Sequence, residues 1–391
     1  MSLAMDFAGS YTLHPGLVQS IEGYRAVLAN GTLSRLLRGK QGESVVQTLG
    51  SLFSLCSHAH RRTARLALNA AKPRSDVLLP LDAPVFLCLE TARDHLRSIA
   101  LDWPRLLPNA QPQTDALHWL GDCPLSLNHS ERSASEAPAW EALAQLRRWL
   151  ENRVLGQSVR QWLSHHHEPE MLAQWCHANA PSLAPARSLD AWHGLAQNLT
   201  PVTRSLDLLD SDPLKQSDAL HTIAHAMASD ANFAQHPLWL GQCAETGPWT
   251  RLRHRSRASS IAPSAWTRLS ARWLELLEIA DLVPDSFAPR TDAMLVSGAL
   301  QVGAGQAIAW CEMARGLLLH WVQLDAQGRV DDYRVLAPTE WNFHPQGVLA
   351  WALTALAPDD TQSAWALAAA FDACVECRVN ANAMQENLCM N

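Results

Sequence analysis

The sequence lacks any run of about 20 uncharged apolar residues, the length that a helix needs to cross a bilayer, so we expect no transmembrane span. Its first ten residues lack the basic segment and the apolar stretch of a secretory signal. The nine cysteines are an odd number without disulfide-like spacing, which is typical of thiols that stay reduced or bind metal in the cytosol. We therefore predict a cytoplasmic protein.

Basic charge is also scarce. The 391 residues carry a formal net charge of −7, which argues against a nucleic-acid partner and against binding to an anionic membrane surface. Only 18 % of the residues are charged and 48 % are hydrophobic, a composition that excludes a disordered chain. A chain of this length buries a large core, as one elaborated domain or two ordinary ones.

The spacing of apolar residues along the sequence is mainly that of amphipathic helices. Apolar residues recur at the spacing of an amphipathic helix in four segments: 43–71, 136–163, 217–233 and 264–282. Near Gly316 the pattern changes, because residues 316–324 and 329–336 read as two strands joined by a turn signal at 325–328. Residues 348–374 return to a helical pattern. We predict a mainly α (α+β) fold.

No internal repeat or low-complexity tract divides the chain, so we predict a single domain over residues 1–391 with four regions. These regions are a small N-terminal β/loop region (1–42), a helical body (43–315), a β-hairpin with a loop (316–345), and a C-terminal helix with a cysteine-bearing tail (346–391).

The strongest chemical signal is Cys374-Val375-Glu376-Cys377 near the C-terminus, together with the distant Cys56. A Cys-x-x-Cys turn lets two thiolates converge on one metal, and Cys56 would then clamp the two ends of the chain around it. Soft thiolates select iron, nickel, zinc or copper(I) over hard cations. The pair alone is equally consistent with half of a structural zinc site or with a redox pair.

The segment around Cys56 carries more information than the cysteine alone. Residues 51–60 resemble an Arg-x-Cys-Gly-x-Cys motif that is followed four residues later by a histidine. Cys56 and His60 match that motif, whereas Phe53 stands in place of the first cysteine and Ser51 in place of the arginine.

Three further segments follow in order along the chain. Cys311–Gly316 resembles a Glu-Ala-Pro-Arg-Gly stretch, and Ala337–Asn342 resembles Pro-Thr/Ser-Thr-Trp-Asn. Asp372–Asn380 resembles Asp-Pro-Cys-x-x-Cys-x-x-His, with asparagine at the position of the histidine. Taken together, the four segments resemble the large subunits of nickel–iron (NiFe) hydrogenases.

The resemblance implies a site, position by position. In that family four cysteines hold nickel, and the second cysteine of each pair also bridges to an iron that carries cyanide and carbon monoxide. Cys56 and Cys377 match the bridging positions, and Cys374 matches a terminal nickel ligand. Arg315 and Thr339 match donors to cyanide, whose nitrogen is an acceptor that is costly to bury without a partner.

The departures from the family pattern imply the loss of one metal. Phe53 cannot be a ligand, so the iron half of the site is kept and the nickel half is lost. His60 matches a histidine that donates a hydrogen bond and does not bind metal. Asn380 replaces the histidine next to which a nickel-dependent protease trims the family's precursors, and the chain ends eleven residues later. Glu22 is a weaker match to the family's proton-gate glutamate.

These departures resemble the hydrogenase assembly proteins of the HupK/HoxV type, which are themselves large-subunit homologues. That resemblance implies a large-subunit-like helical bundle with small peripheral β-elements, and a non-catalytic scaffold in hydrogenase maturation. Such a scaffold would take the Fe(CN)2CO unit transiently from a small carrier chaperone of the HypC type and its iron-assembly partner. It would pass the unit to the hydrogenase large subunit and would hold no nickel.

Three other hypotheses remain open from the sequence. The protein could be a metal-free chaperone or interaction protein for a hydrogenase subunit, a redox enzyme with an altered site, or a protein with a structural zinc site.

Overall fold

The computed structural model describes residues 9–380, apart from residues 26 and 203 and the segments 73–76, 108–119, 126–136, 256–262 and 284–293. The outer ends of two predicted regions, residues 1–8 and 381–391, therefore lie outside the described residues. Within the described part, no helix combines the length and the apolar character that a membrane crossing requires.

Helices form the larger part of the regular structure, as predicted for a mainly α (α+β) fold. The predicted helix over 264–282 is confirmed as α13, and it starts where Ser264 caps it: the Ser264 hydroxyl accepts a hydrogen bond from the backbone N–H of Thr267 (3.1 Å). The α-helices are α2 (Thr32–Leu37), α3 (Glu43–Leu52), α4 (Ser57–Ala71), α5 (Pro84–Arg97), α7 (Ala137–Leu150), α8 (Val159–His166), α9 (Pro169–Asn179), α10 (Ala184–Ala196), α11 (Pro213–Ser229), α12 (Pro248–Arg255), α13 (Ala265–Ala280), α14 (Pro338–Asn342), α15 (Val348–Thr354) and α16 (Thr361–Phe371). Short 3-10 or π turns are η1 (Ala29–Gly31), η2 (Ser54–Cys56), η3 (Ser98–Asp102), η4 (Trp103–Arg105) and η5 (Glu151–Leu155).

The β-structure is larger than the sequence predicted. An antiparallel sheet has the strand order β3-β4-β5-β6, with bounds Ser297–Gly303, Gln306–Met313, Gly316–Leu324 and Val330–Leu336. The predicted hairpin is confirmed as β5 and β6, but the predicted helical body over 43–315 is wrong at its C-terminal end, which contains β3 and β4. Nearly every residue of β4 is buried, and a short apolar run that is buried on both sides cannot be told from a buried helix by periodicity.

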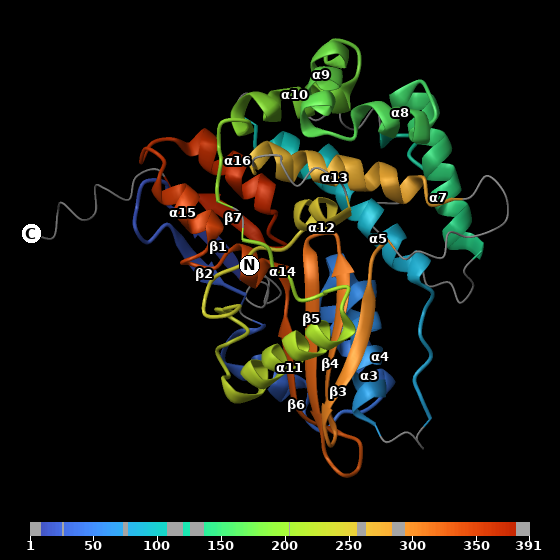
Figure 1. Ribbon diagram of the computed structural model, residues 1–391, viewed down its shortest axis with the longest axis vertical. Helices are drawn as coiled ribbons and strands as arrows, with labels where there is room; N and C mark the ends of the chain where they lie inside the picture. Colours follow the sequence, from blue (N-terminus) through green and yellow to red (C-terminus); the bar gives the residue numbers. More distant parts are fainter. Residues whose placement is uncertain are drawn as a thin grey trace, which may run out of the picture.

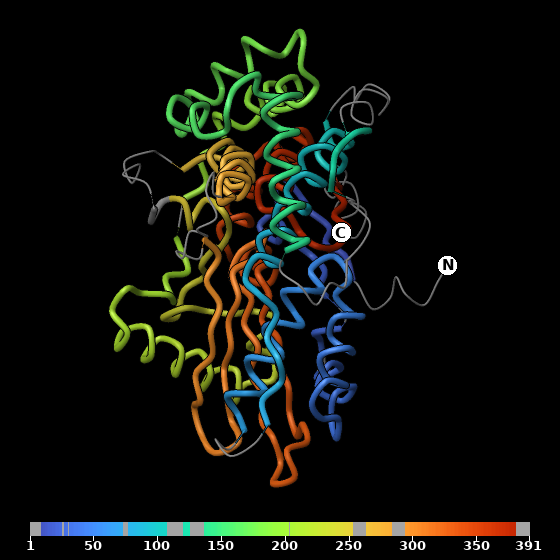
Figure 2. Tube along the Cα trace, turned by 90° about the vertical axis from the view of Figure 1, so that its right-hand side faces the viewer, coloured from blue at the N-terminus to red at the C-terminus, as the bar shows by residue number. Residues whose placement is uncertain are grey.

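Helices cover both faces of this sheet, as Figures 1 and 2 show: α11 lies on one face and α3 with α4 on the other. The strand alternation separates two cores. Ile308 and Trp310 of β4 pack in a cluster with Leu220 of α11, whereas Ala309 belongs to the main core together with Leu68 of α4. The sheet is therefore a central layer of its half of the molecule and not a small peripheral element.

A second, three-stranded sheet joins the two ends of the chain. Its order is β2-β1-β7, with bounds Ile21–Tyr24, Ser10–Leu13 and Glu376–Val379. β1 and β7 are parallel, and Tyr11 is paired with Cys377. This pairing fixes the C-terminal cysteine segment against the N-terminal region.

Candidate functional site

Cys56 lies at a break between two helices. α3 ends at Leu52, the turn η2 follows, and α4 begins at Ser57, so that Cys56 is the N-cap residue of α4. The single helix predicted over 43–71 is thus corrected to two helices, and the thiol lies at a helix N-terminus.

Glu90 of α5 holds this break in place. The first amides of a helix have no partner within the helix, and here the Glu90 carboxylate accepts hydrogen bonds from the backbone N–H groups of His58 (2.7 Å) and Ala59 (2.9 Å). Burial raises the pKa of Glu90 to about 7, and the nearby Asp94 adds to this shift while the two amides oppose it. The start of α4, and with it the position of Cys56, depends on this buried carboxyl group.

The C-terminal cysteines follow a turn that is fixed by ion pairs. α16 ends at Phe371, and Asp372 adopts a left-handed conformation (φ 47°), which aspartate tolerates better than most residues. The Asp372 carboxylate lies 3.0 Å from Nη1 of Arg272 and 3.2 Å from Nε of Arg315. Both arginines are buried, so the direction of the chain toward Cys374 is set by charges inside the core.

These two segments meet at one cavity. Cys56 and Cys374 both line a cavity of about 380 Å³, although 318 positions separate them in the sequence. Phe53 and Arg25 form part of the same wall. Cys377 lies on β7 and is not part of the cavity lining. Among the described residues, no three His, Cys, Asp or Glu side chains are grouped closely enough to hold a metal ion.

Burial keeps the thiols protonated at neutral pH. The pKa of Cys56 is raised, first by burial and then by the neighbouring Cys374 and Glu90, while Arg315 opposes the shift. The pKa of Cys377 is raised to about 12, again mainly by burial, with contributions from Asp372 and Cys374. Since thiolates are the metal-binding form, binding of a metal here must release protons.

Arg315 and Thr339 both lie at this site. The Thr339 hydroxyl is 3.2 Å from the Cys374 sulfur, and the residue is buried. Arg315 is within electrostatic reach of Cys374 and Cys56, and its Nη1 donates to the Asp94 carboxylate (2.9 Å). One hydroxyl and one guanidinium therefore lie near the cavity thiols, although neither residue is part of the cavity lining and the guanidinium is already paired with Asp94 and Asp372.

His60 lies in a buried row of rings. Its Nδ1 is 3.0 Å from Nε2 of His320, whose Nδ1 is 2.7 Å from the Tyr333 hydroxyl. Burial lowers the pKa of both histidines, that of His320 to about 3. The ring of Phe53 stacks on His60 with 3.8 Å between centroids. Phe53 thus fills the position of the missing cysteine with a packed ring.

Glu22 does not reach the cavity. It lies on β2 with a side chain that is 54 % exposed, 3.4 Å from Nε2 of His14, and it is absent from the cavity wall. The weak match of this residue to a proton-gate glutamate gains no support from its position.

The sequence reasoning missed four charged residues around the cavity: Arg25, Glu90, Asp94 and Glu340. A signal was present for two of them, because Glu90 and Asp94 lie four residues apart, on one face of a helix whose first turns are apolar, and both are buried. Arg25 follows directly after Ile21–Tyr24, beside the segment that was compared with the family. No motif indicated that its side chain turns inward.

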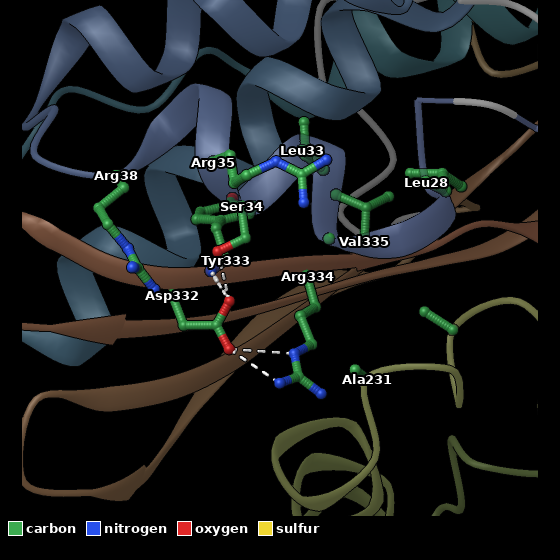
Figure 3. Close-up of a pocket in the computed structure, with 12 residues that line it drawn as sticks. Leu28, Leu33, Ser34, Arg35, Arg38, Ala231, Asp332, Tyr333, Arg334 and Val335 are labelled. Atoms are coloured by element: carbon green, nitrogen blue, oxygen red, sulfur yellow. Dashed lines mark hydrogen bonds and ion pairs between the residues drawn. The ribbon is translucent and has the colours of Figure 1, made fainter.

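A second pocket, shown in Figure 3, lies on the outer side of β6. It has a volume of about 270 Å³ and contains Arg35, Arg38 and Arg334. Arg334 donates to Asp332 (2.9 Å) and to the carbonyl oxygen of Asp230 (2.8 Å). Arg38 donates to the carbonyl oxygen of Asp331 (3.0 Å). The cations of this pocket are satisfied by the protein itself, and we assign it no ligand.

Comparison with known proteins identifies the family. No protein-family model matches the chain. The hydrogenase expression/formation protein HoxV of Cupriavidus necator is 39 % identical over 400 residues, which cover 96 % of this chain and 96 % of that protein. The chain belongs to the HoxV/HupK family of hydrogenase expression/formation proteins. The HupK proteins of Bradyrhizobium diazoefficiens and Rhizobium leguminosarum bv. viciae are each 29 % identical, over 88 % and 89 % of this chain and equal shares of their own lengths.

The HoxV/HupK assignment confirms the resemblance that the four segments indicated. Among solved structures, an NAD+-reducing NiFe hydrogenase in the H2-reduced state aligns over 91 % of this chain and 93 % of its own, with a TM-score of 0.47 and 15 % identity. That score is too low to support an argument about function or about details of the fold.

Proposed function

We propose that this protein is a non-catalytic hydrogenase maturation scaffold that holds the Fe(CN)2CO unit transiently and passes it to the hydrogenase large subunit. The coarser part, a role in hydrogenase formation, rests on relatives that are named for it and match nearly the whole chain. The finer part rests on one observation: Cys56 and Cys374, from opposite ends of the sequence, line the same cavity.

The residues of this cavity fit an iron that carries cyanide and carbon monoxide. Cys56 and Cys374 supply thiolates, which soft metals prefer, and Cys377 supplies a third thiolate from the adjoining strand. Cyanide nitrogen accepts hydrogen bonds, and a buried acceptor needs a donor. The Thr339 hydroxyl, 3.2 Å from the Cys374 sulfur, and the Arg315 guanidinium provide such donors.

Phe53 supports the absence of nickel from the proposed cargo. The position that resembles a nickel-binding cysteine holds a ring that is stacked on His60 at 3.8 Å. His60 serves as a neighbouring donor group and not as a ligand. A site that lacks one thiolate binds its cargo less tightly, which suits a scaffold that must release it. The donor is a HypC-type carrier chaperone with its iron-assembly partner, and the site of action is the cytoplasm.

Infrared spectroscopy tests the proposal. The protein is produced in a host that contains the hydrogenase maturation machinery and in a host that lacks it, and both samples are purified without oxygen. We expect bands of bound cyanide and carbon monoxide, together with iron, only in the first sample. A first sample without bands contradicts the proposal and favours a metal-free chaperone. Zinc without bands indicates a structural zinc site, and hydrogen oxidation with a dye acceptor indicates an altered-site redox enzyme.

A further inference from the structure

Arg25 is a buried cation in the wall of the cysteine cavity. It follows β2 directly, is 6 % exposed, and lines the cavity together with Cys56 and Cys374. Its Cζ atom lies over the Phe53 ring, 5.2 Å from the ring centre. The charge is therefore held close to the two thiols by a ring and by the surrounding backbone.

This guanidinium has few acceptors. Its nearest carboxylate is that of Glu340, with 3.6 Å between Nη1 of Arg25 and Oε2 of Glu340, a distance longer than a hydrogen bond. Its Nε is buried without a hydrogen-bond partner among the described residues. Within the described part of the chain, Nε of Arg315 also lacks a hydrogen bond, but that guanidinium donates to the Asp94 carboxylate (2.9 Å) and lies 3.2 Å from the Asp372 carboxylate. Because a buried donor without a partner is costly, Arg25 is the cavity cation that most needs an acceptor from a ligand.

The electrostatic coupling between Arg25 and the thiols is mutual. Burial opposes the charged form of Arg25, but its pKa is nevertheless raised, by the fields of Cys374, Glu340 and Cys56 in that order. Negative charge that develops at the sulfur atoms is thus compensated by Arg25.

The net charge of the loaded site shows which cargo Arg25 stabilises. An Fe2+ ion with two cyanides and one carbon monoxide is neutral, so binding to two thiolates after loss of their protons leaves a site with charge −2. A bare Zn2+ that replaces two thiol protons leaves the site neutral before and after binding. A fixed cation beside the sulfur atoms therefore stabilises the first complex and leaves the second nearly unchanged.

We infer that Arg25 is the specificity residue of the cavity, which selects the neutral Fe(CN)2CO unit over a bare divalent metal ion by compensating the negative charge of the loaded site. This inference rests on the proposed function and adds a residue to it. Glu340 acts as the counter-ion that holds Arg25 in place when the cavity carries no negative charge.

The test compares Arg25→Met, Arg25→Lys and Glu340→Gln with the wild type, with Arg334→Met from the other pocket as the control. Iron-bound cyanide and carbon monoxide are measured by infrared spectroscopy after production with the maturation machinery. Zinc affinity is measured on the apo protein by competition with a chromophoric chelator. We expect Arg25→Met to lose the infrared bands while its zinc affinity stays within about threefold of the wild type. Arg25→Lys keeps part of the bands, and Arg334→Met keeps them all.

Two further variants carry the test if Arg25→Met does not fold. Arg25→Lys and Glu340→Gln both keep a positive charge beside the two thiols, so both should retain infrared bands and a zinc affinity within about threefold of the wild type.

Several results overturn the inference, and they are distinct from failure of the scaffold proposal. Infrared bands that persist in Arg25→Met overturn it, as does equal loss of iron and zinc, which shows a merely structural role. Loss of the bands in both Arg25→Lys and Glu340→Gln overturns it as well. A wild type without any bands sinks the scaffold proposal, whereas bands in the wild type that persist in Arg25→Met sink this inference alone.

Discussion

The cysteine cavity and the pocket beside β6 both contain arginines, but they differ in how those arginines are partnered. In the pocket beside β6, the Asp332 carboxylate and carbonyl oxygens satisfy Arg334 and Arg38. In the cysteine cavity, Arg25 faces one carboxylate at 3.6 Å, and its Nε has no hydrogen-bond partner among the described residues.

The comparison teaches that the number of arginines in a pocket says little about ligands. The relevant quantity is the capacity for hydrogen bonding and charge compensation that remains after the protein's own pairings. By that measure the cysteine cavity is prepared for a soft-metal cargo whose bound form is anionic, whereas the arginines of the other pocket are paired within the protein.

The largest effect is expected for the cavity thiols. Cys56→Ala and Cys374→Ala should abolish the infrared bands of bound cyanide and carbon monoxide, because each removes one of the two thiolates that line the cavity. Cys377→Ala should lower the amount of bound iron less, since Cys377 lies outside the cavity lining. Cys176→Ala, at a buried position on α9, is the matched control and should keep the full bands.

Loss of the bands in Cys377→Ala alone would contradict this ranking. That outcome would favour the assignment implied by the resemblance, in which Cys56 and Cys377 are the two bridging ligands.

Arg315→Met should cause the largest loss of stability. It removes the partner that lies 2.9 Å from the buried Asp94 carboxylate and 3.2 Å from the Asp372 carboxylate, and among the described residues only Asp372 keeps a second partner, Arg272 at 3.0 Å. Breaking a buried ion pair by removing one partner costs about 3–5 kcal/mol, to be measured by urea unfolding. Arg315→Lys should recover part of this loss. A change below about 1 kcal/mol would show that the network does not hold the turn before Cys374.

Glu90→Gln should change how the stability of the fold around Cys56 depends on pH. Burial raises the pKa of Glu90 from its ordinary 4.5 to about 7, so folding favours the protonated form. The associated stabilisation is complete below about pH 4.5 and is lost as the pH rises through 7. The glutamine of the variant does not titrate. Relative to the variant, the free energy of unfolding of the wild type should fall by roughly 3 kcal/mol between pH 4.5 and pH 8.

Urea unfolding of both proteins at several pH values in that range measures this difference. The same comparison with Glu141→Gln, at an exposed position on α7, serves as the control. A difference between wild type and Glu90→Gln that stays constant or grows with pH would contradict the assignment.

Phe53→Leu tests whether the ring is needed for packing or for the cargo. The variant loses the stacking on His60 and the contact with Arg25, which together contribute about 1–2 kcal/mol. Iron and infrared bands should persist, because the side chain is not a ligand in our account. Thermal unfolding and infrared spectra check the two parts separately, and loss of the bands in a folded variant would show that the ring takes part in binding.

The smallest effect is expected in the second pocket. Arg334→Met removes partly exposed contacts to Asp332 and should cost about 1 kcal/mol or less, with no change in bound iron. Loss of iron in this variant would end the distinction between the two pockets.

Of the predicted site residues, Cys56 and Cys374 line the same cavity, whereas Cys377, Arg315, Thr339 and His60 are not part of its lining. The helix capped by Ser264 and the strand that starts at Gly316 were predictable because capping and strand signals are local. β4 was missed because a strand buried on both faces lacks alternation, whereas β3 is only partly buried. The break before α4 was missed because its cause, Glu90, lies 33 residues away from Ser57 in the sequence.

Arg25 shows a further limit of sequence reasoning. Neither motif nor periodicity indicates that a single arginine after a short strand turns into the cavity. Its inward position depends on packing against Phe53 and on the electrostatic influence of Cys374, which lies at the other end of the chain. Such a residue is found only when the tertiary contacts are known.

The most direct test of the account is X-ray absorption spectroscopy at the iron edge on protein loaded by the maturation machinery. We predict an iron with sulfur scatterers in addition to the linear diatomic ligands, and loss of that iron in Cys56→Ala and in Cys374→Ala. An iron that carries cyanide and carbon monoxide but has no sulfur neighbour, or that persists in both variants, would contradict the claim that this cavity holds the cargo through its two thiols.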